Sequence, residues 1–201
     1  ANAETFDGSS WTEVSDLNTG RRGLGGGGTQ TSALAFGGNT PPSTDKTELW
    51  NGSNWTEVND LNTARWEVYG QGSSNTAVLC VGGQTSPGAI QSITESWNGT
   101  NWTETTNVNS AKTKGAAAGQ SNTSVLVFGG NPSPSQNVKT EQWNGSGWTE
   151  IADLSTGRRE LGGAGIVTAA LGMSGETPSA LTTATEEFRE PTNTTVTFTV
   201  S

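Results

Sequence analysis

The fold of this chain is decided by residues 48–58, which read Glu-Leu-Trp-Asn-Gly-Ser-Asn-Trp-Thr-Glu-Val. Two short runs of alternating polar and large side chains flank an Asn-Gly pair. A period of two indicates β-strands. Asn-Gly between two such runs is the strongest short hairpin signal, because both central residues of a type I′ turn need positive φ. We therefore expect two antiparallel strands joined by a type I′ turn at Asn51-Gly52.

The same phrase recurs along the chain. Its leading glutamates are spaced 44, 47, 46 and 45 residues apart: Glu4, Glu48, Glu95, Glu141 and Glu186. After each of the first four phrases come a polar–apolar step, a basic residue and an apolar run that ends in a small doublet. The polar members are Asp16, Asp60, Asn107 and Asp153, and the basic residues are Arg21, Arg65, Lys112 and Arg158. Repeats of 40 to 50 residues with several strands each are typical of a β-propeller.

Each unit contains four strand candidates. The small-residue run after the basic residue (69–73, 115–120) predicts an inner strand, since glycine suits strands that crowd around an axis. The apolar run before the doublet (33–36, 77–81, 124–128) predicts the second strand, and the two halves of the repeated phrase predict the third and fourth. We expect one all-β domain over residues 1–201, with units at roughly 4–47, 48–94, 95–140 and 141–185 and a partial unit at 186–201.

Ring closure is open at this point. The chain begins with a spare hairpin at residues 4–14 and ends with an alternating run at 195–200. The prediction is four four-stranded blades plus an extra N-terminal hairpin. The four blades could close a small ring that the hairpin caps, or the hairpin could complete a blade of another subunit, because an open sheet edge invites pairing.

The recurring tryptophans and small doublets are the expected core of the repeat. Burying about 200 Å² per tryptophan at roughly 25 cal/mol per Å² gives several kcal/mol for each one. Tryptophans that point outward on one face would instead favour stacking on sugars. The predicted core residues are Trp11, Trp50, Trp55, Trp97, Trp102, Trp143, Trp148, Gly37, Gly38, Gly82, Gly83, Gly129 and Gly130.

Composition limits the chemistry. The formal net charge is −9 and the basic residues are scattered, which argues against nucleic-acid binding. The chain has no histidine, so histidine-based catalysis and histidine-ligated metals are excluded. No apolar stretch approaches the roughly 20 residues that span a membrane. The lone Cys80 lies in an apolar run and is expected in the core. We expect no cofactor and no metal.

Two features suggest catalysis, but each has a simpler explanation. The glutamates of the repeat, including Glu13, Glu57, Glu104 and Glu150, could form the carboxylate pair of a glycoside hydrolase. They recur in every copy, however, which favours cross-strand pairing or an ion pair with the repeated basic residue. The glycine run at 23–28 lacks the Lys-Ser or Lys-Thr of a phosphate loop. We therefore expect no enzymatic activity.

The connections that follow the doublets differ between copies. They cover residues 39–46, 84–94, 131–140 and 176–185 and contain six of the seven prolines. Recognition often lies on variable loops held by a rigid scaffold, although tolerant surface loops vary in the same way. The candidate binding residues on these loops are Asn39, Asp45, Gln84, Gln91, Asn131, Gln136 and Glu176.

The order of these features resembles the kelch repeat, most clearly from residue 33 through Trp50, Trp55 and Asp60-Leu61 to Arg65. The resemblance covers residues 4–188 and implies a kelch-type β-propeller. Kelch propellers bind proteins, bind carbohydrates or support oxidases, and the copper oxidases need histidine ligands that this chain lacks. Here Trp replaces the common Tyr, and Ser174-Gly175 replaces the last glycine doublet.

The uniform phrasing also looks like kelch-like repeat proteins of marine tailed bacteriophages and other environmental viruses. This resemblance implies a non-enzymatic structural or interaction module of a virion, such as a capsid decoration, tail or fibre protein. Its location would be the virion or the extracellular space. The implied partners are other virion proteins or copies of the same chain. The alternative is a carbohydrate-binding propeller that contacts host-surface glycans.

Overall fold

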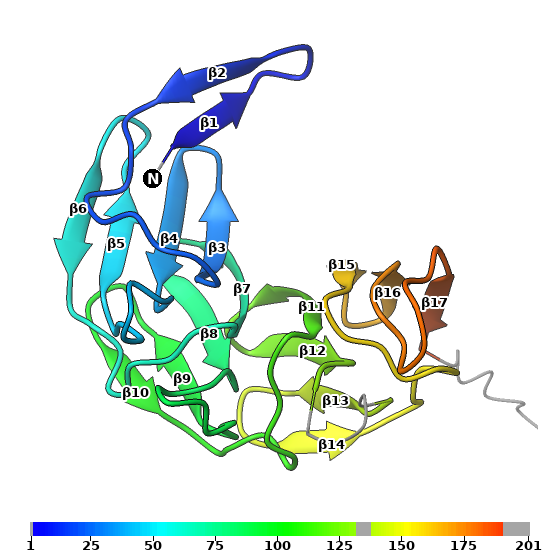
Figure 1. Ribbon diagram of the computed structural model, residues 1–201. Coiled ribbons are helices and arrows are strands. Elements are labelled where there is room, and N and C mark those ends of the chain that lie inside the picture. Colours follow the sequence, from blue (N-terminus) through cyan, green and yellow to red (C-terminus); the bar gives the residue numbers. More distant parts are fainter. Residues whose placement is uncertain (1, 132–137, 191–201) are drawn as a thin grey trace, which may run out of the picture.

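The computed structural model describes residues 2–131 and 138–190, and every regular element in these ranges is a β-strand. The strands form five antiparallel sheets (Figure 1). The first is a hairpin of β1 (Ala3–Phe6) and β2 (Trp11–Val14). Three four-stranded sheets follow: β3 (Gly25–Thr29), β4 (Ser32–Phe36), β5 (Thr47–Trp50), β6 (Trp55–Val58); β7 (Tyr69–Ser74), β8 (Ala77–Val81), β9 (Thr94–Trp97), β10 (Trp102–Glu104); β11 (Ala116–Ser121), β12 (Ser124–Phe128), β13 (Thr140–Trp143), β14 (Trp148–Glu150). The last sheet contains β15 (Gly162–Ile166), β16 (Ala169–Met173) and β17 (Thr185–Arg189).

The sheets follow one another along an arc. Within each sheet the strands pair in sequence order, so each sheet is a meander. The first strands, β3, β7, β11 and β15, contact one another from sheet to sheet on the inner side of the arc (Figure 1). This arrangement is consistent with a β-propeller-like fold, and the predicted four-strand unit is confirmed for three sheets.

The arc does not close. The β1–β2 hairpin and the β15–β17 sheet lie at its two separate ends (Figure 1). The possibility of a small closed ring capped by the hairpin is therefore not what this structure shows. The last sheet has three strands among the described residues, and the run predicted at 195–200 lies outside them.

The hairpin turns differ from the prediction. Trp50 pairs with Trp55, so four residues form the loop, and Gly52 but not Asn51 has positive φ. The Asn51 side-chain oxygen accepts hydrogen bonds from the backbone N–H groups of Ser53 and Asn54, both at 2.9 Å. The prediction of a type I′ turn is wrong, because the asparagine acts as a side-chain cap of a longer loop.

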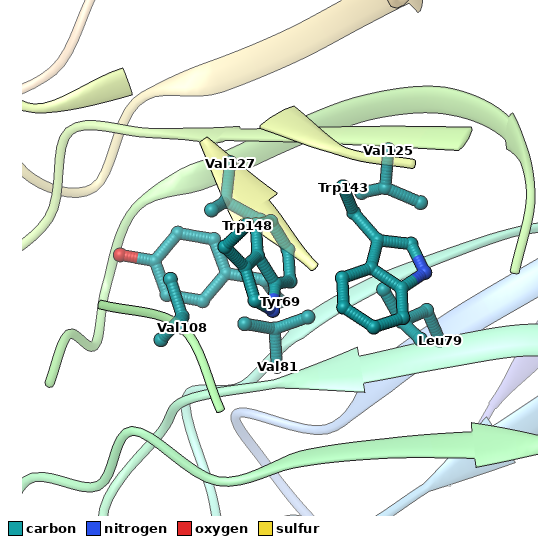
Figure 2. Packing of buried hydrophobic residues seen from close by; sticks show 8 residues of the cluster. All are labelled: Tyr69, Leu79, Val81, Val108, Val125, Val127, Trp143 and Trp148. Atoms are coloured by element: carbon teal, nitrogen blue, oxygen red, sulfur yellow. The ribbon is translucent and has the colours of Figure 1, made fainter. Parts of the chain in front are cut away.

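The core lies between the sheets. Tyr69, Leu79 and Val81 of one sheet pack against residues of the next, including Trp143 and Trp148 (Figure 2). Val78 and Cys80 alternate with Leu79 and Val81 along β8 and therefore point to the opposite face of the sheet. There they pack in a second cluster with Leu34 and Phe36 of the preceding sheet. Cys80 is buried as predicted, and burial raises the pKa of its thiol to about 12.

Close packing of the inner strands requires glycine at particular positions. A Cβ atom at Gly70 would lie 2.6 Å from the backbone of Gly26 on the neighbouring sheet. The glycine doublet also lies against backbone: Gly37 has φ +63°, and a Cβ atom there would lie 2.5 Å from the carbonyl oxygen of Arg65 in the linker after β6. Both positions bring backbones closer than any side chain would allow.

Candidate functional site

Each of four linkers contains an ion pair between the repeated basic residue and the repeated glutamate; the pair is buried in the first three, and in the fourth the Glu186 side chain is 26% exposed. The N···O distances are 3.1 Å for Arg21–Glu48, 2.6 Å for Arg65–Glu95, 2.9 Å for Lys112–Glu141 and 2.7 Å for Arg158–Glu186. The expected ion pair is thereby confirmed. These four glutamates hold the repeat together and are not available as a carboxylate pair in an open site.

The basic residue belongs to the linker that leaves one sheet, and the glutamate belongs to the third strand of the next. In the junction around Glu95, the backbone N–H and the side-chain amide of Asn62 donate to one carboxylate oxygen at 2.8 and 2.7 Å, and Arg65 donates to the other. Arg65 also donates to the carbonyls of Gly82 and Ile93. The linker therefore clamps two strands of the following sheet.

Burial changes the titration of the Lys112–Glu141 pair. Burial lowers the pKa of Lys112, while the Glu141 charge opposes this shift. Burial raises the pKa of Glu141, but the Lys112 charge, together with hydrogen bonds from Lys112, Asn109 and Ser110, brings the pKa below its usual value. The Glu141 carboxylate is therefore charged at neutral pH, and its charge favours the ammonium form of Lys112 against burial.

The tryptophans confirm the core prediction except at the N-terminal end. Trp97, Trp102, Trp143 and Trp148 are buried between sheets, and Trp50 is buried beside the N-terminal hairpin. The prediction is wrong for Trp11, which is 66% exposed because no sheet precedes the hairpin among the described residues. Trp55 next to the hairpin is half-buried, and its indole nitrogen is buried without a hydrogen-bond partner among the described residues.

The residues that differ between copies gather at one end of the sheets. We call this surface the variable face and define it by the loops at 39–46, 84–94 and 176–185 and by four linker pairs: Arg22-Gly23, Trp66-Glu67, Thr113-Lys114 and Arg159-Glu160. Single antiparallel bridges connect the linkers to the loops in three units: Arg22 to Asn39, Trp66 to Gln84, and Arg159 to Glu176. Loops and linkers therefore form one continuous surface.

An unusual backbone conformation marks this face. Glu67, Lys114 and Glu160 have φ of 51°, 58° and 53°, a region that side chains other than glycine rarely adopt. Each donates its N–H to the carbonyl of the equivalent residue in the preceding unit: Glu67 to Gly23, Lys114 to Glu67, and Glu160 to Lys114, at 2.6, 3.4 and 2.6 Å. This chain of bonds holds the three charged side chains in fixed neighbouring positions, and strained backbone of this kind concentrates at functional sites.

The three side chains interact with one another. Lys114 Nζ lies 3.0 Å from Glu160 Oε1 and 3.5 Å from Glu67 Oε1. The hydrogen bond from Lys114 to Glu160 contributes most to raising the pKa of Lys114. Gln84 donates to the second Glu67 oxygen at 2.7 Å. The result is a row of alternating charge across three units.

Arginines extend this row at both ends. Arg159 pairs with Glu176 at 2.8 Å, and their hydrogen bond lowers the pKa of Glu176. The Arg22 guanidinium lies 5.7 Å from the ring centre of Trp66, within the range of a cation–π contact. Opposite charges balance along the face, so the row favours neither polyanions nor free cations.

The structure brings some of the predicted loop residues into this network and leaves others out. Gln84 and Glu176 take part through their side chains. Asn39 and Asn131 contribute backbone contacts to Arg22 and Thr113. The Asp45 carbonyl accepts a hydrogen bond from the Leu61 N–H, and the Gln91 side-chain amide donates to the Ala89 carbonyl, so neither residue joins the network through these bonds. Gln136 lies outside the described residues.

Sequence reasoning missed Glu67, Lys114 and Glu160. All three stand two residues after a repeated basic residue, where the first copy has Gly23. A position that changes from Gly to Glu, Lys and Glu, two residues after an otherwise constant basic position, is a signal that could have identified them.

Residues 2–131 and 138–190 contain no group of three or more His, Cys, Asp or Glu side chains that could hold a metal ion. The same part of the chain has no helix long and apolar enough to cross a membrane.

Comparisons with known proteins identify the fold and no more. No protein-family model matches the chain, and no curated protein matches it. Among solved structures, one titled "Structure of YjhT" superimposes with a TM-score of 0.75 at 14% sequence identity. The match covers 92% of this chain and 71% of that chain. The chain therefore shares its β-sheet architecture with a protein of very different sequence.

Proposed function

We propose that this chain is a kelch-type, propeller-like scaffold that binds a macromolecular partner through its variable face and performs no catalysis. One observation carries the proposal: most of the repeated tryptophans and ion-pair residues are buried, whereas the described linker and loop residues that differ between copies gather on one surface. A rigid frame that presents unlike residues is the usual organisation of a binding module.

The charge pattern indicates the kind of partner. Glu67, Lys114 and Glu160 present alternating charges at fixed spacing, which suits a protein surface with the complementary pattern. The resemblance of the repeat phrase to viral kelch-like proteins supports a virion component whose partner is another virion protein. The glycan alternative has less support, because five of the seven repeated tryptophans are buried and Trp11 alone of the seven is largely exposed, so they offer no row of rings to sugars.

A position-specific photo-crosslink tests the proposal. Benzoylphenylalanine replaces Glu160 on the variable face or, as the matched control, Glu57 on the outer strand β6; the two side chains are 56% and 52% exposed. The purified chain is illuminated with a protein extract of particles that an antibody to the chain labels in electron micrographs. We expect one defined protein to crosslink at position 160 and not at position 57.

Three outcomes would count against the proposal: equal crosslinking at both positions, none at position 160, or particles that the antibody never labels. A glycan array run in parallel addresses the alternative. Binding to a sugar that Glu160→Lys abolishes would replace the protein partner with a carbohydrate.

A further inference from the structure

Cavities mark the N-terminal end of the arc. One of about 310 Å³ lies between the β1–β2 hairpin and the sheet β3–β6, lined by Phe6, Trp11, Trp50 and Trp55 among others. Another of about 490 Å³ follows β3 and is lined by its glycines and Leu24. The hairpin corresponds to the third and fourth strands of a unit, so the cavities lie where the first and second strands of that unit would pack.

The hairpin presents half of a junction that recurs inside the chain. In the internal junction, Trp97 and Trp102 pack against Leu34 and Phe36 of the preceding sheet, with Phe36 and Trp102 in edge contact at 4.9 Å. The equivalent pair in the hairpin is Phe6 and Trp11, whose ring centres are 5.2 Å apart. Phe6 is 45% exposed, and Trp11 is even more exposed. The hairpin therefore carries the aromatic pair of a junction, but no described sheet packs on that pair as the Leu34–Phe36 strand packs on Trp97 and Trp102.

The counterpart lies at the opposite end of the arc. On β16, Ala170 packs in the cluster with Leu126 and Phe128, so Leu171 points to the other face. Counting back from the small doublet, Leu171 and Met173 stand where Leu34 and Phe36 stand in the first full unit. Leu171 is 37% exposed. The last sheet therefore shows the aliphatic half of the same junction.

We propose that copies of this chain associate head to tail, with the Phe6–Trp11 pair of one copy packed on the Leu171–Met173 face of the next. A second copy is the fitting occupant, because each exposed face is one half of an interface that the chain already forms internally. Within one chain the two faces lie at separate ends of the arc (Figure 1). Such an interface joins unlike surfaces, so it produces a ring or a filament.

Two exposed positions allow the interface to be tested without touching the core or the variable face. Trp11→Lys removes the aromatic end, and Leu171→Lys removes the aliphatic end. We expect the 201-residue wild-type chain to associate with rising concentration in sedimentation velocity. Each variant alone should associate at least roughly tenfold more weakly, as expected for the centre of an interface.

Mixing gives the decisive result. Each variant keeps one intact end, so an equal mixture of the two should form heterodimers and nothing larger. The matched control is Leu181→Lys, which changes a leucine of the variable-face loop 176–185 that is 85% exposed and belongs to neither end of the proposed interface; it should associate like the wild type. Far-UV circular dichroism and thermal unfolding check that all variants are folded.

Several results would overturn the proposal. A wild-type chain that stays monomeric at high concentration contradicts it directly. Loss of association in Trp11→Lys but not in Leu171→Lys would indicate hairpin-to-hairpin pairing instead. Two variants that fail to form a heterodimer would show that the two faces are not partners. None of these results depends on whether the variable face binds a partner.

Discussion

The internal junctions and the N-terminal hairpin contain the same sequence phrase in opposite environments. Trp97 is fully buried and Trp11 is mostly exposed; Glu95 is clamped by Asn62 and Arg65, whereas Glu4 is exposed at the start of the arc. The local strand pairing is the same in both places. The repeat therefore encodes a hairpin plus one half of an interface, and its side chains stabilise the fold only where a neighbouring sheet supplies the other half.

The largest expected difference in unfolding free energy is between substitutions at Glu95 and at Glu4. Glu95→Gln leaves the Arg65 guanidinium buried without its counter-charge, which should cost about 3–5 kcal/mol of unfolding free energy. The matched variant Glu4→Gln changes an exposed residue and should cost less than about 0.5 kcal/mol. Urea denaturation of both variants measures the difference. Equal losses would mean that the buried ion pair is not what stabilises the junction.

Substitutions at Trp97 and at Trp11 should differ almost as much in their effect on the unfolding free energy. Trp97→Ala leaves a cavity in the cluster with Leu34 and Phe36 and should cost about 3–5 kcal/mol, enough to loosen or unfold the domain. Trp11→Ala should stay within about 0.5 kcal/mol of the parent when measured at a concentration where the chain is monomeric. Thermal unfolding followed by circular dichroism tests this. If Trp97→Ala melted like the parent, its assigned packing role would be wrong.

A smaller effect distinguishes one internal junction from the others. Lys112 has one side-chain nitrogen, which contacts Glu141. Arg65 and Arg158 each have two terminal nitrogens: one donates to the paired glutamate, and the other donates to two backbone carbonyls. Lys112→Arg should add these carbonyl contacts and raise the unfolding free energy by about 1 kcal/mol. The reciprocal Arg65→Lys should lower it. Urea denaturation that reverses these signs would contradict the comparison.

Much of the architecture was predictable because it repeats. Residues that recur at fixed offsets reveal the period of the repeat and the Arg–Glu pairing. They also locate the strands at 77–81 and 124–128, and with the first of these the buried Cys80. The turn at Asn51 was predicted wrongly, because an asparagine can either adopt positive φ or cap the loop with its side chain. The choice depends on how many residues the strand register leaves in the loop.

The candidate site was predictable only in part. Gln84 and Glu176 were identified because their loops vary, but Glu67, Lys114 and Glu160 were not. These three residues lie 46 or 47 positions apart in the sequence. They become neighbours only when the sheets pack side by side, and no local pattern reports that packing.

By itself the sequence determined the all-β fold, the length of each unit and the residues that hold a unit to its neighbour, because strand alternation and repeated spacing are local properties. The tertiary structure alone decided which copies of those residues are buried, which linker residues share the variable face, and that the arc stays open. Burial and proximity belong to pairs of sheets, and a residue at either end of the arc lacks the neighbour that the same residue has in the middle.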